Sequence, residues 1–569
     1  MGSSRLNAVA LGNNPADLLL KNGRVVDVVT QTIYSGNIAI VDGLIAGVGD
    51  YTEAKEIIDL QGAVVTPGFI NAHLHVESSM AVPSVYCTEE LAWGVTTLIT
   101  DPHEIANVAG ARGIRYMLEA GRSMPINYYV QLPSCVPATP FENAGTVMRA
   151  KDLVACMDWH GVLGLGEMMN LPGVLNEDVE VMQKLSVFRN ERRPIDGHAP
   201  GVTGRELAAY AAQGITTDHE SVSWGEAREK LRSGIAVWAR QGSASRNLED
   251  ILAGALAEGA DFSRMGFCTD DKHLADIHRE GTVRSMVLQA MGLGMKPLCA
   301  IAMATINPAR VYGLNHLGEI APGKQADLVV WDDLETLKPL KVFYKGRDAL
   351  QSVAEKRRTV EVPGALLETV HLGDFAQQDL VLTIEDDRDY PVIEMLPGQI
   401  FTNALTIKGD KVKEFIAAGY MSYISVLERH HATGHIGKGL IWGYGLKRGA
   451  AATTVAHDSH NLIVVGQDAL SMETAVRELE NLGGGYALAE GDRVVESLAL
   501  DVAGLMSTLD ARNLTEKLED ISRTAHQMGV AEGVDPFISL SFMALPVIPK
   551  LKITDMGLFD VTKFEFVKF

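Results

Sequence analysis

Eight apolar segments, separated by polar loops and helix-like stretches, lie between residues 64 and 271. The strand candidates are residues 64–75, 96–101, 127–133, 162–168, 194–198, 215–220, 234–239 and 265–271. Residues 204–213, 224–233 and 248–259 carry the apolar spacing of helices. Strands that alternate with helices indicate parallel βα units, and eight such units predict a (β/α)8 TIM-like barrel.

Two β-rich segments flank this pattern. Residues 17–65 and 317–347 alternate short strand-like runs with polar turns, so we expect them to pair as one small β-sandwich that the barrel splits. The pattern of strand-like and helix-like segments changes toward the C-terminus, where it includes a helical run at 473–483. This pattern predicts an additional α/β domain. The predicted domains are the sandwich at 1–65 and 309–365, the barrel at 66–308 and the C-terminal α/β domain at 366–569.

Polar side chains with metal-binding groups stand at the C-terminal ends of the predicted barrel strands. In (β/α)8 proteins this edge is where active sites are built. The first strand ends in His-Leu-His, and residues i and i+2 of a strand point to the same face. Nitrogen and oxygen ligands without thiolates suit Zn, Mn or Fe. The sequence therefore predicts a metal site made by His73, His75, Glu167, His198, His219 and Asp270.

Other interpretations exist for single residues. One histidine at a strand end is more often a hydrogen-bonded structural residue than a ligand. Glu167 stands among apolar neighbours, where an unpaired carboxylate is costly to bury and a cation would offset that cost. Asp271 and His273 are candidates for substrate contact or for outer contacts of the site. The late histidines suggest a further metal site, or a lid or interface at the barrel mouth: His430, His431, His435, His457 and His460.

The order of these ligands resembles the amidohydrolase superfamily across residues 17 to 347. Longer motifs, across nearly the whole chain, resemble bacterial adenine deaminases: VVTPGFINAHLHVESSM, TDPHEIANVAG, GLGEMMN, DGHAPG, TTDHES, CTDD, GHIGKG and VAHDSHNLIVVG. The resemblance implies hydrolytic deamination of adenine to hypoxanthine and ammonia at a binuclear Mn, Fe or Zn centre. It also implies one ion on His73, His75 and Asp270, and the other on His198 and His219. Glu167 would bridge them in place of the carbamylated lysine of many relatives.

The implied mechanism assigns roles to four residues. Metal ions lower the pKa of bound water, and the resulting hydroxide would attack C6 of the purine, with Glu167 as bridging ligand. Asp270 is expected to accept the proton of that water. Glu104 or His103, in Asp-Pro-His-Glu, is the candidate acid that protonates the ring. The alternative interpretation is a helix start, with Asp101 as N-cap and Glu104 as capping-box acid.

Rival functions remain on the same scaffold. A deaminase of another aminated base would need the same set of metal ligands. A cyclic-amide hydrolase of the hydantoinase or dihydroorotase kind usually carries the strand-four lysine, and Glu167 counts against it. A non-catalytic scaffold would be expected to have lost its ligands, whereas all six are present.

Charge and composition limit the partners. The net charge of −22 repels nucleic acid and anionic membranes. No apolar run approaches a membrane span, and the first twenty residues lack the continuous apolar run of a secretory signal. Five scattered cysteines without a C-x-x-C pair indicate a reducing compartment. We therefore expect a cytoplasmic enzyme that acts on a small molecule, and the family resemblance implies a homodimer or higher homo-oligomer.

Overall fold

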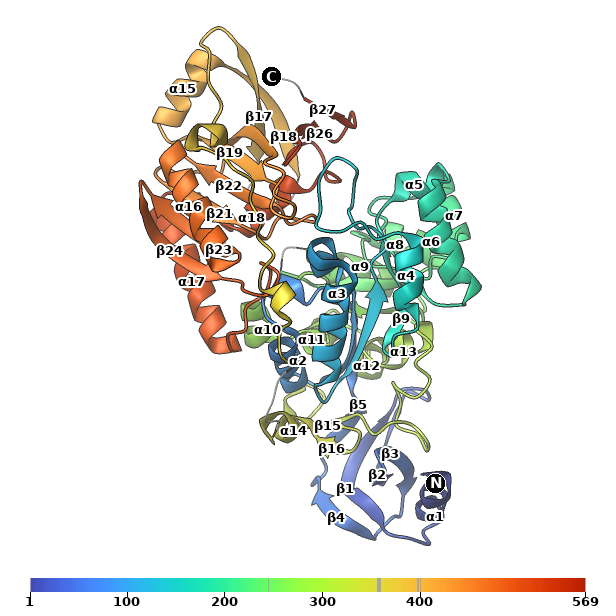
Figure 1. Ribbon diagram of the computed structural model, residues 1–569. Helices are drawn as coiled ribbons and strands as arrows, with labels where there is room; N and C mark the ends of the chain where they lie inside the picture. The colour runs from blue at the N-terminus through green and yellow to red at the C-terminus, as the bar shows by residue number, and fades with distance from the viewer. Residues whose placement is uncertain (1, 244, 356–359, 397–398, 400, 568–569) are drawn as a thin grey trace.

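The computed structural model describes residues 2–243, 245–355, 360–396, 399 and 401–567. Figure 1 shows three parts, with an N-terminal sheet at the bottom, a barrel in the middle and a C-terminal domain at the top. No helix among the described residues is long and apolar enough to cross a membrane. The predicted barrel with a divided accessory sheet and an additional α/β domain is confirmed.

The accessory sheet is built from both ends of the barrel segment. Its first part contains β1 (Ala16–Asp27), β2 (Thr32–Val41), β3 (Leu44–Gly49), β4 (Ala54–Asp59) and β5 (Val64–Pro67). Its second part contains β14 (Leu328–Trp331), β15 (Pro339–Tyr344) and β16 (Arg347–Asp348). Antiparallel pairing of β5 with β14 joins the two parts into one mixed sheet. Helix α1 (Gly2–Ala10), which the sequence pattern did not predict, contacts β2 and β3.

The barrel strands run in chain order, each parallel to the next. A parallel bridge between Leu74 and Asp270 brings the first strand next to the last, so the barrel is nearly closed. The eight predicted strands correspond to β6 (Phe69–Leu74), β7 (Val95–Thr100), β8 (Asn127–Leu132), β9 (Val162–Met168), β10 (Ile195–Gly197), β11 (Thr217–Asp218), β12 (Ala236–Arg240) and β13 (Met265–Cys268).

The strand predicted at 64–75 is in fact two strands that belong to different sheets. The change takes place at Gly68, whose amide donates to the carbonyl of Asp327. A Cβ at this position would lie 2.0 Å from Oγ1 of Thr96, so only glycine fits between the two sheets. An apolar run alone does not reveal such a division, because both strands are buried.

Helices surround the barrel and bury its apolar outer face. The helices predicted at 204–213, 224–233 and 248–259 are α7 (Gly204–Ala212), α8 (Trp224–Arg232) and α9 (Leu248–Glu258). The others are α2 (Pro83–Ala92), α3 (His103–Arg122), α4 (Ala150–Met157), α5 (Leu171–Leu175), α6 (Val179–Asn190), α10 (Leu274–Glu280), α11 (Val283–Gly292), α12 (Pro297–Met303) and α13 (Ile306–Val311).

The C-terminal domain is built on a second eight-stranded sheet, mostly antiparallel, in the order β18-β17-β20-β19-β22-β21-β23-β24. Helix α16 (Ala469–Leu482), which includes the helix predicted at 473–483, packs against this sheet, and α17 (Ala511–Gln527) contacts its last strand. The strands are β17 (Asp389–Met395), β18 (Thr402–Lys408), β19 (Met421–Leu427), β20 (Ile436–Trp442), β21 (Ala450–Thr453), β22 (Leu462–Gly466), β23 (Gly485–Glu490) and β24 (Arg493–Ala499).

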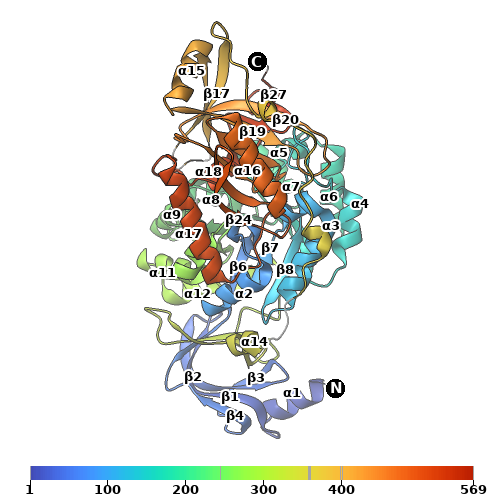
Figure 2. The same cartoon turned by 60° about the vertical axis from the view of Figure 1, so that its left-hand side comes forward.

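The C-terminal domain lies against the barrel (Figure 2), and the two share apolar core residues. Met80 and Ala81, which follow the first barrel strand, belong to the core of the C-terminal domain. Conversely, Val502 and Leu505 belong to the barrel core. Shared cores of this kind hold two domains in one arrangement, so the C-terminal domain can supply side chains to the barrel mouth.

Candidate functional site

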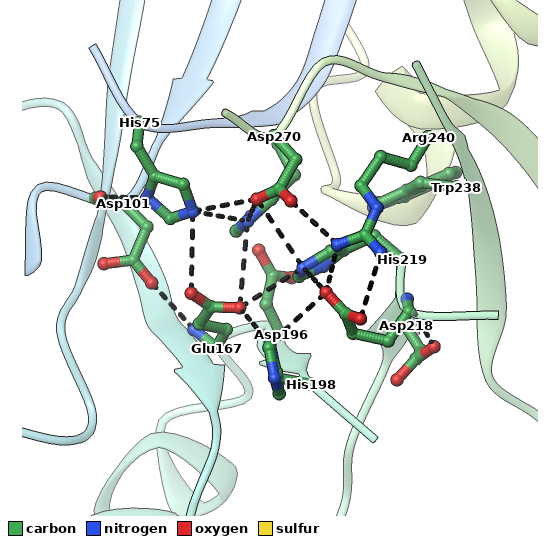
Figure 3. A network of polar contacts seen from close by, with 12 residues as sticks. His75, Asp101, Glu167, Asp196, His198, Asp218, His219, Trp238, Arg240 and Asp270 are labelled. Atoms are coloured by element: carbon green, nitrogen blue, oxygen red, sulfur yellow. Dashed lines mark hydrogen bonds and ion pairs between the residues drawn. The ribbon is translucent and has the colours of Figure 1, made fainter. Parts of the chain in front are cut away.

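The six predicted ligands converge at the C-terminal edge of the barrel, and Figure 3 labels all of them except His73. Five of them are buried, and the His198 side chain is 27% exposed. Each comes from the end of a different strand, except for the pair on the first. His73 and His75 are at the end of β6, Glu167 is in β9, and the loops that follow β10, β11 and β13 provide His198, His219 and Asp270.

The first group of predicted ligands, His73, His75 and Asp270, brings hydrogen-bond acceptors face to face. Nδ1 of His75 donates to the carbonyl of Asp101 at 2.8 Å, so in the neutral ring Nε2 carries a lone pair. This Nε2 lies 3.2 Å from Nε2 of His73 and 3.1 Å from Oδ1 of Asp270. Lone pairs that point at one another in a buried place need a cation or protons between them.

Glu167 connects this group to a second one. Its Oε1 lies 3.5 Å from Nε2 of His75, whereas its Oε2 lies 2.8 Å from Nδ1 of His198 and 3.2 Å from Nε2 of His219. Nε2 of His219 is buried and has no hydrogen-bond partner among the described residues. The two oxygens of one carboxylate therefore face the two groups of imidazoles.

Both central carboxylates are ionised. Burial raises the pKa of Glu167, but the neighbouring His198 and His219 lower it more, so the pKa lies well below its usual value. Burial also raises the pKa of Asp270, and Arg240 with His73 and His75 brings it well below the usual range. Buried imidazoles and ionised carboxylates form the donor set of a metal centre, and such clusters are typical of amidohydrolase metal sites.

Sequence reasoning missed two members of this network, Glu220 and Arg240. Oε1 of Glu220 lies 3.4 Å from Nε2 of His219 and 3.6 Å from Nδ1 of His198. Arg240 donates to Oδ2 of Asp270 at 2.8 Å and to Glu220, and it is buried. The sequence could have indicated Arg240 if the seventh strand had been predicted one residue longer, because β12 ends on Arg240 and the ends of the barrel strands form the site.

A helix does start here, with Glu104 in its first turn, but the capping roles predicted for Asp101 and Glu104 are wrong. Helix α3 begins at His103, and the residue before it, Pro102, provides no side-chain cap. Oδ2 of Asp101 instead accepts the amide of Glu167 at 2.8 Å. A Cβ at Gly166 would lie 2.2 Å from the same Oδ2, so glycine permits this approach. Asp101 therefore helps to fix the backbone that carries Glu167.

His103 and Glu104 lie between the cluster and a neighbouring pocket. Nδ1 of His103 is 3.5 Å from Oε1 of Glu167, and its Nε2 is 3.5 Å from Oε1 of Glu104. The pocket is lined by Glu77, Glu104 and Asp271 from the barrel, and by His457 and Phe542 from the C-terminal domain. Such a pocket has apolar walls and acidic groups beside the cluster, an arrangement that suits a small aromatic molecule with N–H donors.

Of the residues with open interpretations, Asp271 and His273 line this pocket. Asp271 also accepts a hydrogen bond from Ser78. Among the late histidines, His430 and His431 bond backbone carbonyls, at 2.8 Å to Ser459 and 3.0 Å to Ala144. These two imidazoles therefore have structural partners.

Comparison with known proteins gives matches over both halves of the chain. Residues 64–362 match the amidohydrolase family, and residues 399–565 match the adenine deaminase C-terminal domain. The chain is 44% identical to adenine deaminase 2 of Carboxydothermus hydrogenoformans, over 98% of each protein. It is 43% identical to an adenine deaminase of Dehalococcoides mccartyi, over 99% of this chain and 98% of the relative. The chain therefore belongs to the adenine deaminase family of the amidohydrolase superfamily.

Proposed function

We propose that this protein converts adenine and water into hypoxanthine and ammonia at the barrel mouth. Family membership over the full length supports the reaction, and the observation that carries the location is the convergence of six distant side chains beside a pocket. In the overall reaction the oxygen of water replaces the amino group on C6. One hydrogen of that water ends on the ring and the other on the ammonia.

The proposed centre holds two divalent ions, chosen among Mn, Fe and Zn. His73, His75 and Asp270 would hold one ion, His198 and His219 would hold the other, and Glu167 would bridge them. The orientation of Glu167, with one oxygen toward each group, supports the bridging role. When bound, such ions act as Lewis acids and make water a nucleophile near neutral pH.

The chain's own groups provide the remaining functions. Arg240 fixes Oδ2 of Asp270, so that Oδ1 faces the two histidines of the first group. This orientation supports Asp270 as the acceptor of a proton from the attacking water. Glu104 lines the pocket and is the proposed group that interacts with the ring, and His103 lies between Glu104 and Glu167. His103 is thus in place to pass a proton between them.

The test loads the metal-free protein with Mn, Fe or Zn, measures bound metal by mass spectrometry, and follows ultraviolet absorbance. The substrates are adenine, guanine, cytosine, hydantoin and dihydroorotate. We expect turnover of adenine, two ions per chain, and a fall of kcat by about 10²–10⁴-fold in Asp270→Asn. If metal-loaded protein leaves adenine unchanged but hydrolyses another member of the panel, the proposed substrate is wrong. Light scattering of the same samples tests the homo-oligomer that the family resemblance implies.

A further inference from the structure

One segment of the C-terminal domain reaches the substrate pocket. It connects β21 to β22 and carries His457 and His460, both of which contact the barrel residue Glu104. Nδ1 of His457 lies 2.8 Å from Oε1 of Glu104, and Nε2 of His460 bonds to Oε2. Each carboxylate oxygen thus has its own imidazole partner. His460 and Glu104 are separated by more than 350 positions in the chain, so only the docked domains create this contact.

This cluster has the composition of a metal site, but its hydrogen bonds oppose that interpretation. Nδ1 of His460 accepts the backbone amide of Ala456 at 3.1 Å. The proton of the neutral ring is therefore on Nε2, where it is donated to Glu104. A metal on Nε2 would move that proton to Nδ1, directly against the amide of Ala456. Burial lowers the pKa of His460 to about 4, which agrees with a neutral ring.

A buried arginine, Arg429, fixes the backbone of His460. Arg429 is fully buried, and its Nε donates to the carbonyl of His460. The same guanidinium donates to the carbonyls of Thr369 and Ala503. His460 itself has φ +54°, a left-handed conformation that non-glycine residues adopt uncommonly. The surrounding bonds thus fix one orientation of this imidazole.

His457 forms one side of the pocket and stacks on Phe542, with ring centroids 4.9 Å apart and planes at 26°. Burial lowers its pKa, but the Glu104 carboxylate raises it more, to about 9. The ring is therefore protonated near neutral pH and pairs with an ionised Glu104, whose pKa burial raises and His457 and His460 lower further, well below its usual value.

We propose that His457 and His460 are positioning residues that orient the Glu104 carboxylate toward the substrate, so that the C-terminal domain completes the active site. This inference rests on the proposed function, in which Glu104 interacts with the purine ring. Glu104 lies on the first turn of α3, and among the described barrel residues the only side-chain donor near its carboxylate is Nε2 of His103, 3.5 Å from Oε1. The imidazoles of His457 and His460, two donors from a second domain, restrict the Glu104 carboxylate to one orientation.

The experiment compares full-length, metal-loaded variants. His460→Leu removes the donor, and His460→Gln keeps an N–H at the position of Nε2. We expect kcat on adenine to fall about 10–100-fold in His460→Leu, with KM changed far less, and to recover in large part in His460→Gln. His457→Leu and His457→Asn form a second pair, since the amide nitrogen of asparagine replaces Nδ1. The control is His431→Leu, which removes another bond from this domain to the barrel, to Ala144, without touching Glu104.

The outcomes separate this inference from the proposed function. Turnover of adenine by the parent enzyme tests the function before any variant is made. With turnover established, a kcat of His460→Leu equal to that of His431→Leu overturns the positioning role. Loss of a bound ion in His460→Leu also overturns it, because the cluster would then be a metal site. In a Glu104→Gln background, His460→Leu should have little further effect, whereas an undiminished effect would show that His460 acts independently of Glu104.

Discussion

Replacing Lys230 with methionine should destabilise the barrel far more than removing a neighbouring surface charge. Lys230 lies in α8 and is fully buried, and its Nζ donates to Oδ1 of Asp218 at 2.5 Å and to Oε1 of Glu226 at 3.2 Å. On the same helix, Arg228 pairs with Glu258 at 2.6 Å, but these side chains are 38% and 48% exposed. The two positions therefore give a matched comparison of a buried and an exposed ion pair.

The expected magnitudes differ several-fold. Removing one partner of a buried pair costs about 3–5 kcal/mol, because the other charge remains buried without compensation. Removing an exposed pair costs about 0–1 kcal/mol. In a domain of about 150–250 residues, 1 kcal/mol shifts Tm by about 2–4 °C. Lys230→Met should therefore lower the Tm of the barrel by about 6–20 °C, whereas Arg228→Met should lower it by at most about 4 °C.

Thermal unfolding of metal-loaded variants, followed by circular dichroism at one scan rate, measures the difference. The double variant Lys230→Met/Asp218→Asn should recover part of the loss, because it removes one of the two carboxylate charges that Lys230→Met leaves without a partner. Asp218 also accepts the amides of Ala199 and Glu220, which adjoin His198 and His219, so Lys230→Met should retain metal less well. A Tm for Lys230→Met equal within error to that for Arg228→Met would refute the argument from burial.

Two further predictions concern a backbone contact and a surface charge. Gly166→Ala should reduce metal content and adenine turnover, because the new Cβ would displace Asp101 from the amide of Glu167; normal metal content by mass spectrometry would contradict this. Burial raises the pKa of Asp17, but hydrogen bonds from Lys55, the Asp42 amide and Arg5 lower it to about 2. Since the unfolded pKa is about 3.9, this stabilisation is present above pH ~4 and is lost as the pH falls toward 2. Asp17→Asn should therefore reduce the acid sensitivity of Tm slightly, and an unchanged acid profile would count against it.

Much of the cluster of buried imidazoles and carboxylates could be predicted from the sequence because a parallel barrel places the C-terminal ends of its strands at one edge. His73 and His75 alternate along one strand, and Glu167 ends another, so strand assignment alone brings them together. Strand assignment did not predict Arg240 and Glu220, and the cause differs between the two. Arg240 is one residue beyond the predicted strand, and Glu220 turns into the site from a loop, where strand alternation no longer applies.

Glu104 shows the limit of local reasoning. The order Asp101, Pro102, His103, Glu104 has the residue types of a helix start, and such a start needs only neighbours in the chain. The acceptors are used elsewhere, however, because Asp101 accepts the amide of Glu167 and Glu104 accepts from the C-terminal domain. Contacts over hundreds of residues leave no trace in local spacing, so only the tertiary structure could show that Asp101 and Glu104 do not cap the helix.

The charge of the cluster argues that it is a binding site and not a structural core. Three carboxylates, Glu167, Glu220 and Asp270, are buried together, and the guanidinium of Arg240 offsets one of their charges. The remaining negative charge must be balanced, because uncompensated buried charge costs several kcal/mol. Without a metal ion only protons on the imidazoles can balance it. Accordingly, burial lowers the pKa values of His75 and His219, but the carboxylates raise them well above their usual value. Divalent cations balance the same charge, and a chain that served only as a scaffold would be more stable with apolar side chains at these positions.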